Sequence, residues 1–267
     1  MIRKAIFPVG GFGTRFLPAT KSMPKEMLPV VDKPLIQYAV EEAAEAGCEE
    51  FIFVTGRGKT SIEDHFDHSV ELEHILSTKS KAEALVIAQS MLHPPGKVAY
   101  VRQQQPAGLG HAIWCARHLI HDEPVAVLLA DDLINASPGC LKQMVDEYKE
   151  GHMMAIMEVD YAQTSAYGII TPGSQSGRMV EVNGLIEKPK LTEAPSRLAV
   201  VGRYILSPSV FKELDRQEMG AGGETSAAAV PRSAFHWDDG PEPHCGRKAE
   251  VGSSADVSSL VKPSSHV

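Results

Sequence analysis

The feature that most constrains the fold is a series of short apolar runs that alternate with segments of helical spacing. The predicted strands are residues 5–9, 51–55, 97–103 and 125–130, and the last run, VAVLLA, contains no polar residue. The predicted helices are residues 35–46, 61–65, much of 70–91, 110–119 and 138–149. Apolar strands without polar alternation, separated by helices, predict an α/β protein with a Rossmann-like, doubly wound sheet that is mostly parallel but mixed and is covered by helices on both faces.

The pattern changes after the first half of the chain. From residue 153 onward it is richer in strands, which we predict at residues 153–159, 168–171, 179–188 and 198–206. After residue 224 the chain is rich in Ser, Ala, Pro and Gly and has no sustained period. We therefore predict a first half of about residues 1–150, a β-rich part over residues 151–224, and an irregular, poorly ordered tail over residues 225–267.

Charge and composition exclude several classes of protein. The 34 acidic and 26 basic residues give a net charge of −8, which argues against broad nucleic-acid binding. Four cysteines without paired spacing indicate reduced thiols, and we expect a cytoplasmic protein. No apolar run approaches the length of a membrane span or has the form of a signal peptide, so no membrane partner is predicted.

The loop after the first strand, PVGGFGTRFLPATKSMPKEMLPV, is rich in glycine, proline and cations. It matches neither the G-x-G-x-x-G dinucleotide fingerprint, because Phe16 stands at the third position, nor a P-loop. Its glycines would nevertheless let backbone N–H groups approach an anion. Arg15 offers a rigid fork for phosphate and Lys25 a mobile point charge. The plain alternative is a glycine-rich turn with solvated cations.

Three other positions at strand or helix ends could carry chemistry. Asp131 and Asp132 follow VAVLLA and could hold Mg²⁺, or they could cap the next turn. Glu187 and Lys188 could bind a sugar hydroxyl and a phosphate, or could form a surface ion pair before a proline. Gly108 begins a helix, where a glycine suits close approach of a flat ring or phosphate but also suits a plain turn.

Long stretches of the chain resemble the sugar-1-phosphate nucleotidyltransferase family. The signature is GGFGTRFLP with PKEMLPV, and the likeness continues through DKPLIQYAVEEAAEAG, KTSIEDHFD, VRQQQPAGLGHA, DEPVAVLLADD, TSAYGII, IEKPK, APSRLAVVGRYILSP and GAGGE. It covers residues 1–224 and is closer to the bacterial UTP–glucose-1-phosphate uridylyltransferase branch. The helical segment over residues 61–76 favours this branch over the thymidylyl branch.

The resemblance implies a reaction and a role for each matching residue. It implies Mg²⁺-assisted, in-line attack of glucose 1-phosphate on the α-phosphorus of UTP, which yields UDP-glucose and pyrophosphate. Arg15 and Lys25 would hold the triphosphate, Asp131 would bind Mg²⁺ with Asp132 behind it, and Lys188 would contact the sugar phosphate. The remaining implied positions are the uridine contacts Gly10, Gly11, Glu26, Gln103 and Gly108, and the sugar contacts Gly168 and Glu187.

The tail departs from the family pattern. After GAGGE the family continues with an apolar helix and an Asp-Cys-Gly-x-Lys motif, whereas this chain has His244-Cys245-Gly246-Arg247-Lys248. Histidine thus stands where the second Mg²⁺ ligand of the family would be. Two alternatives therefore stay open: a nucleotidyltransferase for another base or sugar, and a nucleotide-binding homologue with impaired catalysis. A homo-oligomer is also open, with contacts that the altered tail would weaken.

Overall fold

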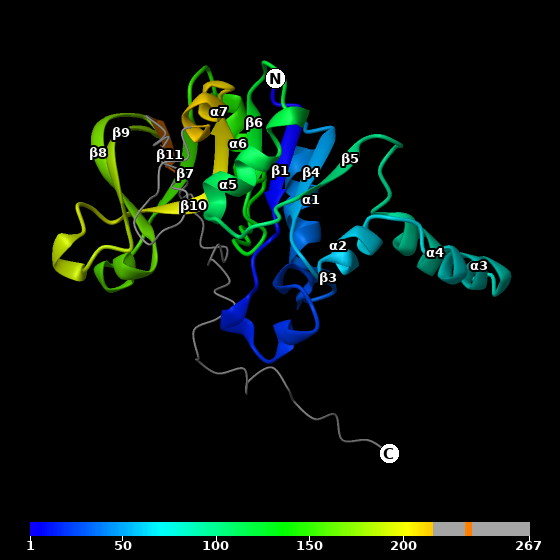
Figure 1. Cartoon of the computed structure of the whole chain (residues 1–267). Coiled ribbons are helices and arrows are strands. Elements are labelled where there is room, and N and C mark those ends of the chain that lie inside the picture. Colours follow the sequence, from blue (N-terminus) through cyan, green and yellow to red (C-terminus); the bar gives the residue numbers. More distant parts are fainter. Residues whose placement is uncertain (216–232, 237–267) are drawn as a thin grey trace.

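A nine-stranded mixed sheet forms the centre of the protein (Figure 1). The structure, a computed structural model, describes residues 1–215 and 233–236. The strand order in the sheet is β5-β4-β1-β6-β10-β7-β11-β9-β8. In chain order these strands are β1 (Lys4–Pro8), β4 (Glu50–Thr55), β5 (Val98–Arg102), β6 (Val125–Leu128), β7 (Met153–Glu158), β8 (Gly168–Ser176), β9 (Met179–Glu187), β10 (Leu198–Leu206) and β11 (Ser233–His236). A separate two-stranded ribbon pairs β2 (Pro29–Val30) with β3 (Lys33–Pro34).

Every segment predicted to be helical contains a helix, with somewhat different bounds, and one further helix over residues 209–214 was not predicted. They are α1 (Leu35–Glu45), α2 (Thr60–His65), α3 (Val70–Thr78), α4 (Ala82–Gln89), α5 (Gly108–Cys115), α6 (Cys140–Glu147) and α7 (Ser209–Leu214). The predicted helix over much of 70–91 is two helices, because the chain turns between them at Ser80, which has a φ of 53°. Both α3 and α4 extend away from the sheet in Figure 1. No helix in the described part of the chain is long and apolar enough to cross a membrane.

The first half of the chain forms the parallel side of the sheet. Strand β1 pairs in parallel with β4 and β6, and β4 pairs in parallel with β5. Alternate residues of β1 enter different cores: Phe7 packs with α1 and α6, whereas Ile6 packs with α5 and α7. Both faces are therefore covered by helices, which confirms the doubly wound arrangement. The carboxyl ends of these four strands lie at one edge, where such folds bind ligands.

The second half adds mostly antiparallel strands to the same sheet. Strand β10 pairs antiparallel with β6 on one side and with β7 on the other, and so joins the two halves. Strands β8 and β9 form a hairpin in which Gly168 lies opposite Glu187. The fold is thus the mixed sheet predicted, with its parallel pairs concentrated in the first half.

One short strand lies within residues 225–267, for which the sequence pattern predicts irregular structure. Strand β11 pairs in parallel with β7 and antiparallel with β9. A strand inserted between two others satisfies its main-chain groups on both sides, and this pairing does not require the side-chain alternation that sequence patterns detect. The rest of that predicted tail, including His244, lies outside the described residues.

Candidate active site

The loop after β1 is built from tight turns rather than a helix. Gly13 has a φ of 64°, and three 3-10 turns follow it, at Thr14–Phe16, Ala19–Lys21 and Lys25–Met27. The positive φ requires glycine because a side chain would strain this conformation. At Gly13, moreover, an added Cβ would lie 3.1 Å from Cβ of Lys25, so the glycine also lets the first turn pack against the last. Arg15 lies exposed in the first turn.

Lys25 and Asp131 form the contact that links this loop to the next strand end. The Nζ atom of Lys25 lies 2.7 Å from Oδ2 of Asp131, which follows β6. Their side chains are 20% and 40% exposed, so the pair is accessible at the edge of the sheet. A cation and a carboxylate in contact at the carboxyl ends of β1 and β6 can serve a phosphate and a metal ion respectively.

Glu26 and Lys59 form a buried ion pair beside that contact. Their side chains are 1% and 6% exposed, and Nζ of Lys59 lies 2.8 Å from Oε2 of Glu26. Burial raises the pKa of Glu26, while the charges of Lys59 and Lys25 act in the opposite direction. Oε1 of Glu26 is buried and has no hydrogen-bond partner within the described residues. Such a carboxylate oxygen is available to accept a hydrogen bond from a ligand.

Gln103 connects the carboxyl end of β5 to the start of α5. Its Nε2 donates to the carbonyl of Gly108 at 3.1 Å and lies 3.0 Å from Nδ1 of His111. Its Oε1 faces Gly10 so closely that a Cβ there would lie only 2.9 Å away. Gly108 has a φ of 91°, a conformation that favours glycine. The structure thus brings together Gly10, Gln103 and Gly108 from three separate segments.

The β8–β9 hairpin carries the predicted sugar-binding residues. Gly168 and Glu187 face each other, and an added Cβ at Gly168 would lie 3.0 Å from Oε2 of Glu187. Nζ of Lys188 lies 3.2 Å from Oε1 of Glu187, and both side chains are half exposed or more. Lys188 has a φ of 45°, and its N–H donates to the carbonyl of Tyr167, which holds this unusual conformation.

Tyr204 on β10 lies between the two groups of predicted residues. Burial raises the pKa of its hydroxyl, and the carboxylates of Asp132, Glu187 and Asp131 raise that pKa further. All three carboxylates therefore lie near enough to Tyr204 to influence it electrostatically. The hairpin and the β6 turn thus both carry carboxylates that raise the pKa of this hydroxyl.

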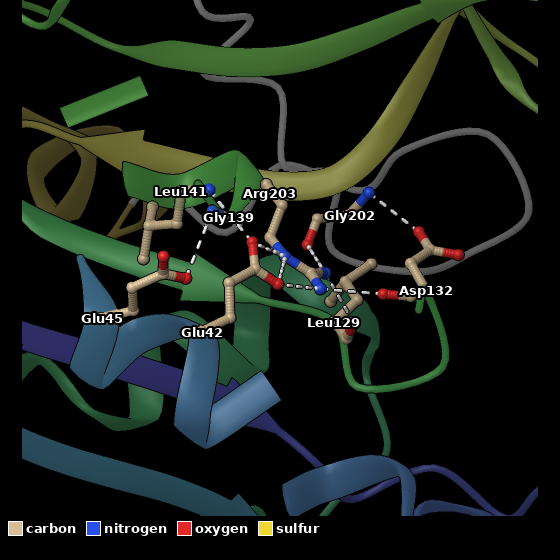
Figure 2. Close-up of polar contacts among 8 residues, drawn as sticks. All are labelled: Glu42, Glu45, Leu129, Asp132, Gly139, Leu141, Gly202 and Arg203. Carbon is tan, nitrogen blue, oxygen red and sulfur yellow. Dashed lines mark hydrogen bonds and ion pairs between the residues drawn. The ribbon is translucent and has the colours of Figure 1, made fainter. Parts of the chain in front are cut away.

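Asp132 and the turn that holds it are anchored by the buried Arg203 of β10 (Figure 2). The backbone N–H of Gly202 donates to Oδ2 of Asp132 at 2.8 Å. The guanidinium of Arg203 contacts Glu42 of α1 and the carbonyls of Leu129 and Asp132. Asp132 thus has a structural role here, which accounts for its position behind Asp131.

Sequence patterns missed the residues that support the site. Lys59, Glu42, Arg203 and His111 each act through a neighbour. They lie within stretches that carry the family resemblance, but their residue type and spacing do not mark them as site residues. One signal was available at Arg203, since a charged residue within the apolar run LAVVGRYIL must find a partner if the strand is buried.

The residues of the site fit a divalent metal ion that is bound jointly by the protein and by substrate phosphates. They do not fit an ion bound by protein ligands alone. No cluster of three or more His, Cys, Asp or Glu residues suited to a metal occurs among residues 1–215 and 233–236. Mg²⁺ typically takes one or two carboxylates and completes its shell with water and substrate phosphates. Asp131, at the mouth of a basic loop, meets that requirement.

Comparisons with known proteins identify the family of the chain. The nucleotidyl transferase family model matches residues 4–237, most of the chain. The chain belongs to this family. It is 51% identical over 225 residues to a UTP–glucose-1-phosphate uridylyltransferase of Bacillus subtilis, and the match covers 84% of this chain and 77% of the relative. It is 47% identical over 257 residues to the enzyme of the same name from Komagataeibacter xylinus, with 92% and 90% of the two chains covered.

A solved structure has the same nucleotidyltransferase fold. The crystal structure of a UDP-glucose pyrophosphorylase complexed with UDP-glucose matches with a TM-score of 0.76 and 44% sequence identity, covering 88% of this chain and 90% of the other. The nucleotidyltransferase membership predicted from the opening loop is therefore confirmed.

Proposed function

We propose that this protein transfers a uridylyl group from UTP to glucose 1-phosphate and releases pyrophosphate. The observation that carries the proposal is the Lys25–Asp131 contact, which puts a phosphate-binding cation and a metal-binding carboxylate side by side. The names of the relatives, which share about half of their residues with this chain, support the same reaction. The solved UDP-glucose pyrophosphorylase complexed with UDP-glucose supports the product class.

The reaction needs positioning and charge neutralisation more than a protein nucleophile. A phosphate oxygen of glucose 1-phosphate would form a bond to the α-phosphorus of UTP. The bond from that phosphorus to the bridging oxygen would break, and the electron pair would leave with pyrophosphate. Lys25 and the exposed Arg15 would bind the triphosphate oxygens and balance the charge that develops on them.

The nucleotide half would correspond to about residues 1–150. Gly10 and Gly11 would let the base lie close to the backbone after β1. Glu26, with its buried Oε1, and Gln103, whose amide is oriented by Gly108 and His111, would offer hydrogen bonds to the uracil. A base with a different donor pattern would leave such buried groups unpaired, which is the physical basis of selection for UTP.

The sugar-phosphate part would correspond to residues 151–224. Glu187, opposite Gly168, would accept hydrogen bonds from glucose hydroxyls, and Lys188 would bind the phosphate. Asp131 would hold a divalent cation, for which we propose Mg²⁺. When bound, such an ion neutralises charge on the phosphates during transfer.

The decisive experiment is a pyrophosphate-release assay with a panel of nucleoside triphosphates and sugar 1-phosphates, with Mg²⁺ and with EDTA. We expect UTP with glucose 1-phosphate and Mg²⁺ to give the highest kcat/KM. Higher turnover with another base or sugar would assign the protein to a different sugar nucleotide. Calorimetric UTP binding without any pyrophosphate release would instead identify a binding-only homologue.

A further inference from the structure

We propose that Arg203 is a positioning residue that, with Glu42, sets the place of Asp131 and so controls the metal-dependent part of nucleotide binding. The inference rests on the proposed function and deepens it. Neither residue reaches the edge of the site, since Arg203 and Glu42 are 1% and 9% exposed. They act through the turn that follows β6 (Figure 2).

Arg203 uses its guanidinium to hold both ends of the turn that contains Asp131. Nη1 donates to the carbonyl of Leu129 at 3.0 Å, and Nη2 donates to the carbonyl of Asp132 at 2.8 Å. The turn is closed by the N–H of Asp132, which donates to the carbonyl of Leu129 at 3.2 Å. Residues 130 and 131 thus lie between the carbonyls of Leu129 and Asp132, which both accept hydrogen bonds from the buried guanidinium of Arg203.

The remaining donors of Arg203 connect the turn to the rest of the fold. Nε and Nη2 lie 3.0 Å and 2.7 Å from the carboxylate of Glu42, and Nη1 also donates to the carbonyl of Gly202 at 3.0 Å. A guanidinium has five N–H donors. Each of the five donors of Arg203 has an acceptor here. These contacts fit the guanidinium of arginine and not the single ammonium of lysine.

Glu42 joins a helix to this network. Its Oε1 also accepts the N–H of Leu141 at the start of α6, and Oε2 of the neighbouring Glu45 accepts the N–H of Gly139 (Figure 2). The position of α6 and the position of the β6 turn are therefore coupled through one carboxylate.

The turn packs closely against the backbone of β10 at Gly202. A Cβ added at Gly202 would lie 2.6 Å from both Oδ2 of Asp132 and Cβ of Leu129. A turn so confined will transmit a change at Arg203 to Asp131 rather than absorb it.

The test compares Arg203→Lys with the wild-type full chain. Calorimetry measures UTP binding in EDTA and in Mg²⁺, and pyrophosphate release is measured as a function of Mg²⁺ concentration. We expect binding in EDTA to stay within about threefold, whereas the Mg²⁺ concentration for half-maximal activity rises about tenfold, as for other residues that support a metal ligand. The gain in UTP affinity on adding Mg²⁺ should fall by a similar factor.

Lys4→Met is the matched control for a buried cation elsewhere in the sheet. Lys4 lies at the opposite end of β1, buried, with its Nζ 2.8 Å from both Glu123 and the carbonyl of Leu119. This variant should lower the unfolding temperature but leave the Mg²⁺ dependence unchanged. If Arg203→Lys does not fold, Glu42→Gln, which keeps the side-chain shape, decides by the same two measurements.

The inference is overturned if pyrophosphate release by the folded Arg203→Lys or Glu42→Gln variant depends on Mg²⁺ as it does in wild type. It is also overturned if the variant loses as much UTP affinity in EDTA as it loses in Mg²⁺. These outcomes presuppose a wild-type protein whose UTP binding and turnover respond to Mg²⁺. If the wild type shows no such response, the proposed function fails as well, and the two failures are thereby distinguished.

Discussion

The ammonium of Lys25 lies 2.7 Å from Oδ2 of Asp131, although 106 residues separate the two along the chain. The contact joins a turn of the opening loop to the residue that follows β6. Each group balances the charge of the other at the edge of the sheet. In the proposed function, Lys25 exchanges this partner for a phosphate and Asp131 exchanges it for a metal ion.

Lys25→Ala removes the cation proposed to meet the triphosphate. We expect kcat/KM to fall about a hundredfold or more, because charge on the transferring phosphoryl group is no longer balanced. The free energy of unfolding should change by less than about 1 kcal/mol, since the ion pair is partly exposed. Pyrophosphate release and thermal unfolding check both values. Activity within about threefold of wild type would rule the role out.

Two neighbouring glycines give a matched pair of variants. In Gly10→Ala the new Cβ would lie 2.9 Å from Oε1 of Gln103, so that side chain must move. In Gly11→Ala the nearest atom is Cε of Lys25 at 3.9 Å, an ordinary contact. We expect both variants to weaken UTP binding about tenfold, roughly 1.4 kcal/mol, but for different reasons.

The two causes of weaker UTP binding can be distinguished in the protein without ligand. Gly10→Ala should disturb Gln103 and its contact with His111, detectable in the NMR spectrum of the His111 ring without ligand. Gly11→Ala should leave that spectrum unchanged and act only through the bound nucleotide. Unaltered UTP affinity in Gly11→Ala would show that the ligand does not approach this glycine.

Glu187→Gln separates sugar recognition from nucleotide recognition. The amide keeps the shape but loses the charge that strengthens hydrogen bonds from sugar hydroxyls, worth roughly 1.5–3 kcal/mol. We expect a higher KM for glucose 1-phosphate and nearly unchanged UTP affinity, measured by steady-state kinetics and calorimetry. A variant that loses UTP binding instead would place Glu187 in the other half of the site.

Glu26 should give the protein a distinctive pH dependence of stability. Burial raises the pKa of this carboxyl above its ordinary 4.5, so the folded chain retains a proton that the unfolded chain releases. The stability that the Glu26 carboxyl contributes is present below pH 4.5 and is lost as pH rises through its folded-state pKa. Denaturant unfolding at several pH values should therefore show wild type losing stability relative to Glu26→Gln as pH rises above 4.5.

Glu181 is the control for this measurement. Its pKa is lowered, chiefly by the hydrogen bond from the Ser174 side chain. Relative to Glu181→Gln, wild type should therefore gain stability as pH rises from the folded-state pKa of Glu181 toward 4.5, below the region in which Glu26 acts. A stability difference between wild type and Glu26→Gln that did not vary with pH would contradict the proposed environment of Glu26.

The altered tail predicts a demand for high Mg²⁺. Histidine at position 244, outside the described residues, is a poorer ligand for a hard cation than the aspartate of the family motif. We expect low activity that rises with Mg²⁺, little recovery in His244→Asp, and greater recovery when residues 225–267 are replaced by a family-like helix and Asp-Cys-Gly-x-Lys segment. Ordinary turnover in modest Mg²⁺ would show that Asp131 and the basic loop suffice.

The parallel half of the sheet and the character of the opening loop follow from the amino-acid sequence alone. Runs such as VAVLLA must be buried on both faces, and glycines with prolines after β1 cannot continue as a helix. These are local consequences of hydrophobicity and backbone sterics, so they can be read without knowing any long-range contact. The same residues carry the family resemblance that the family match confirms.

Which distant residues meet depends instead on the tertiary packing of the chain. The pairing of Arg203 with Glu42 spans 161 residues, and that of Lys59 with Glu26 spans 33. Strand β11 likewise depends on the gap between β7 and β9 that other segments create. The physical reason is common to all three: a buried charge or an unpaired strand edge must be satisfied, but which group satisfies it depends on how helices and strands pack.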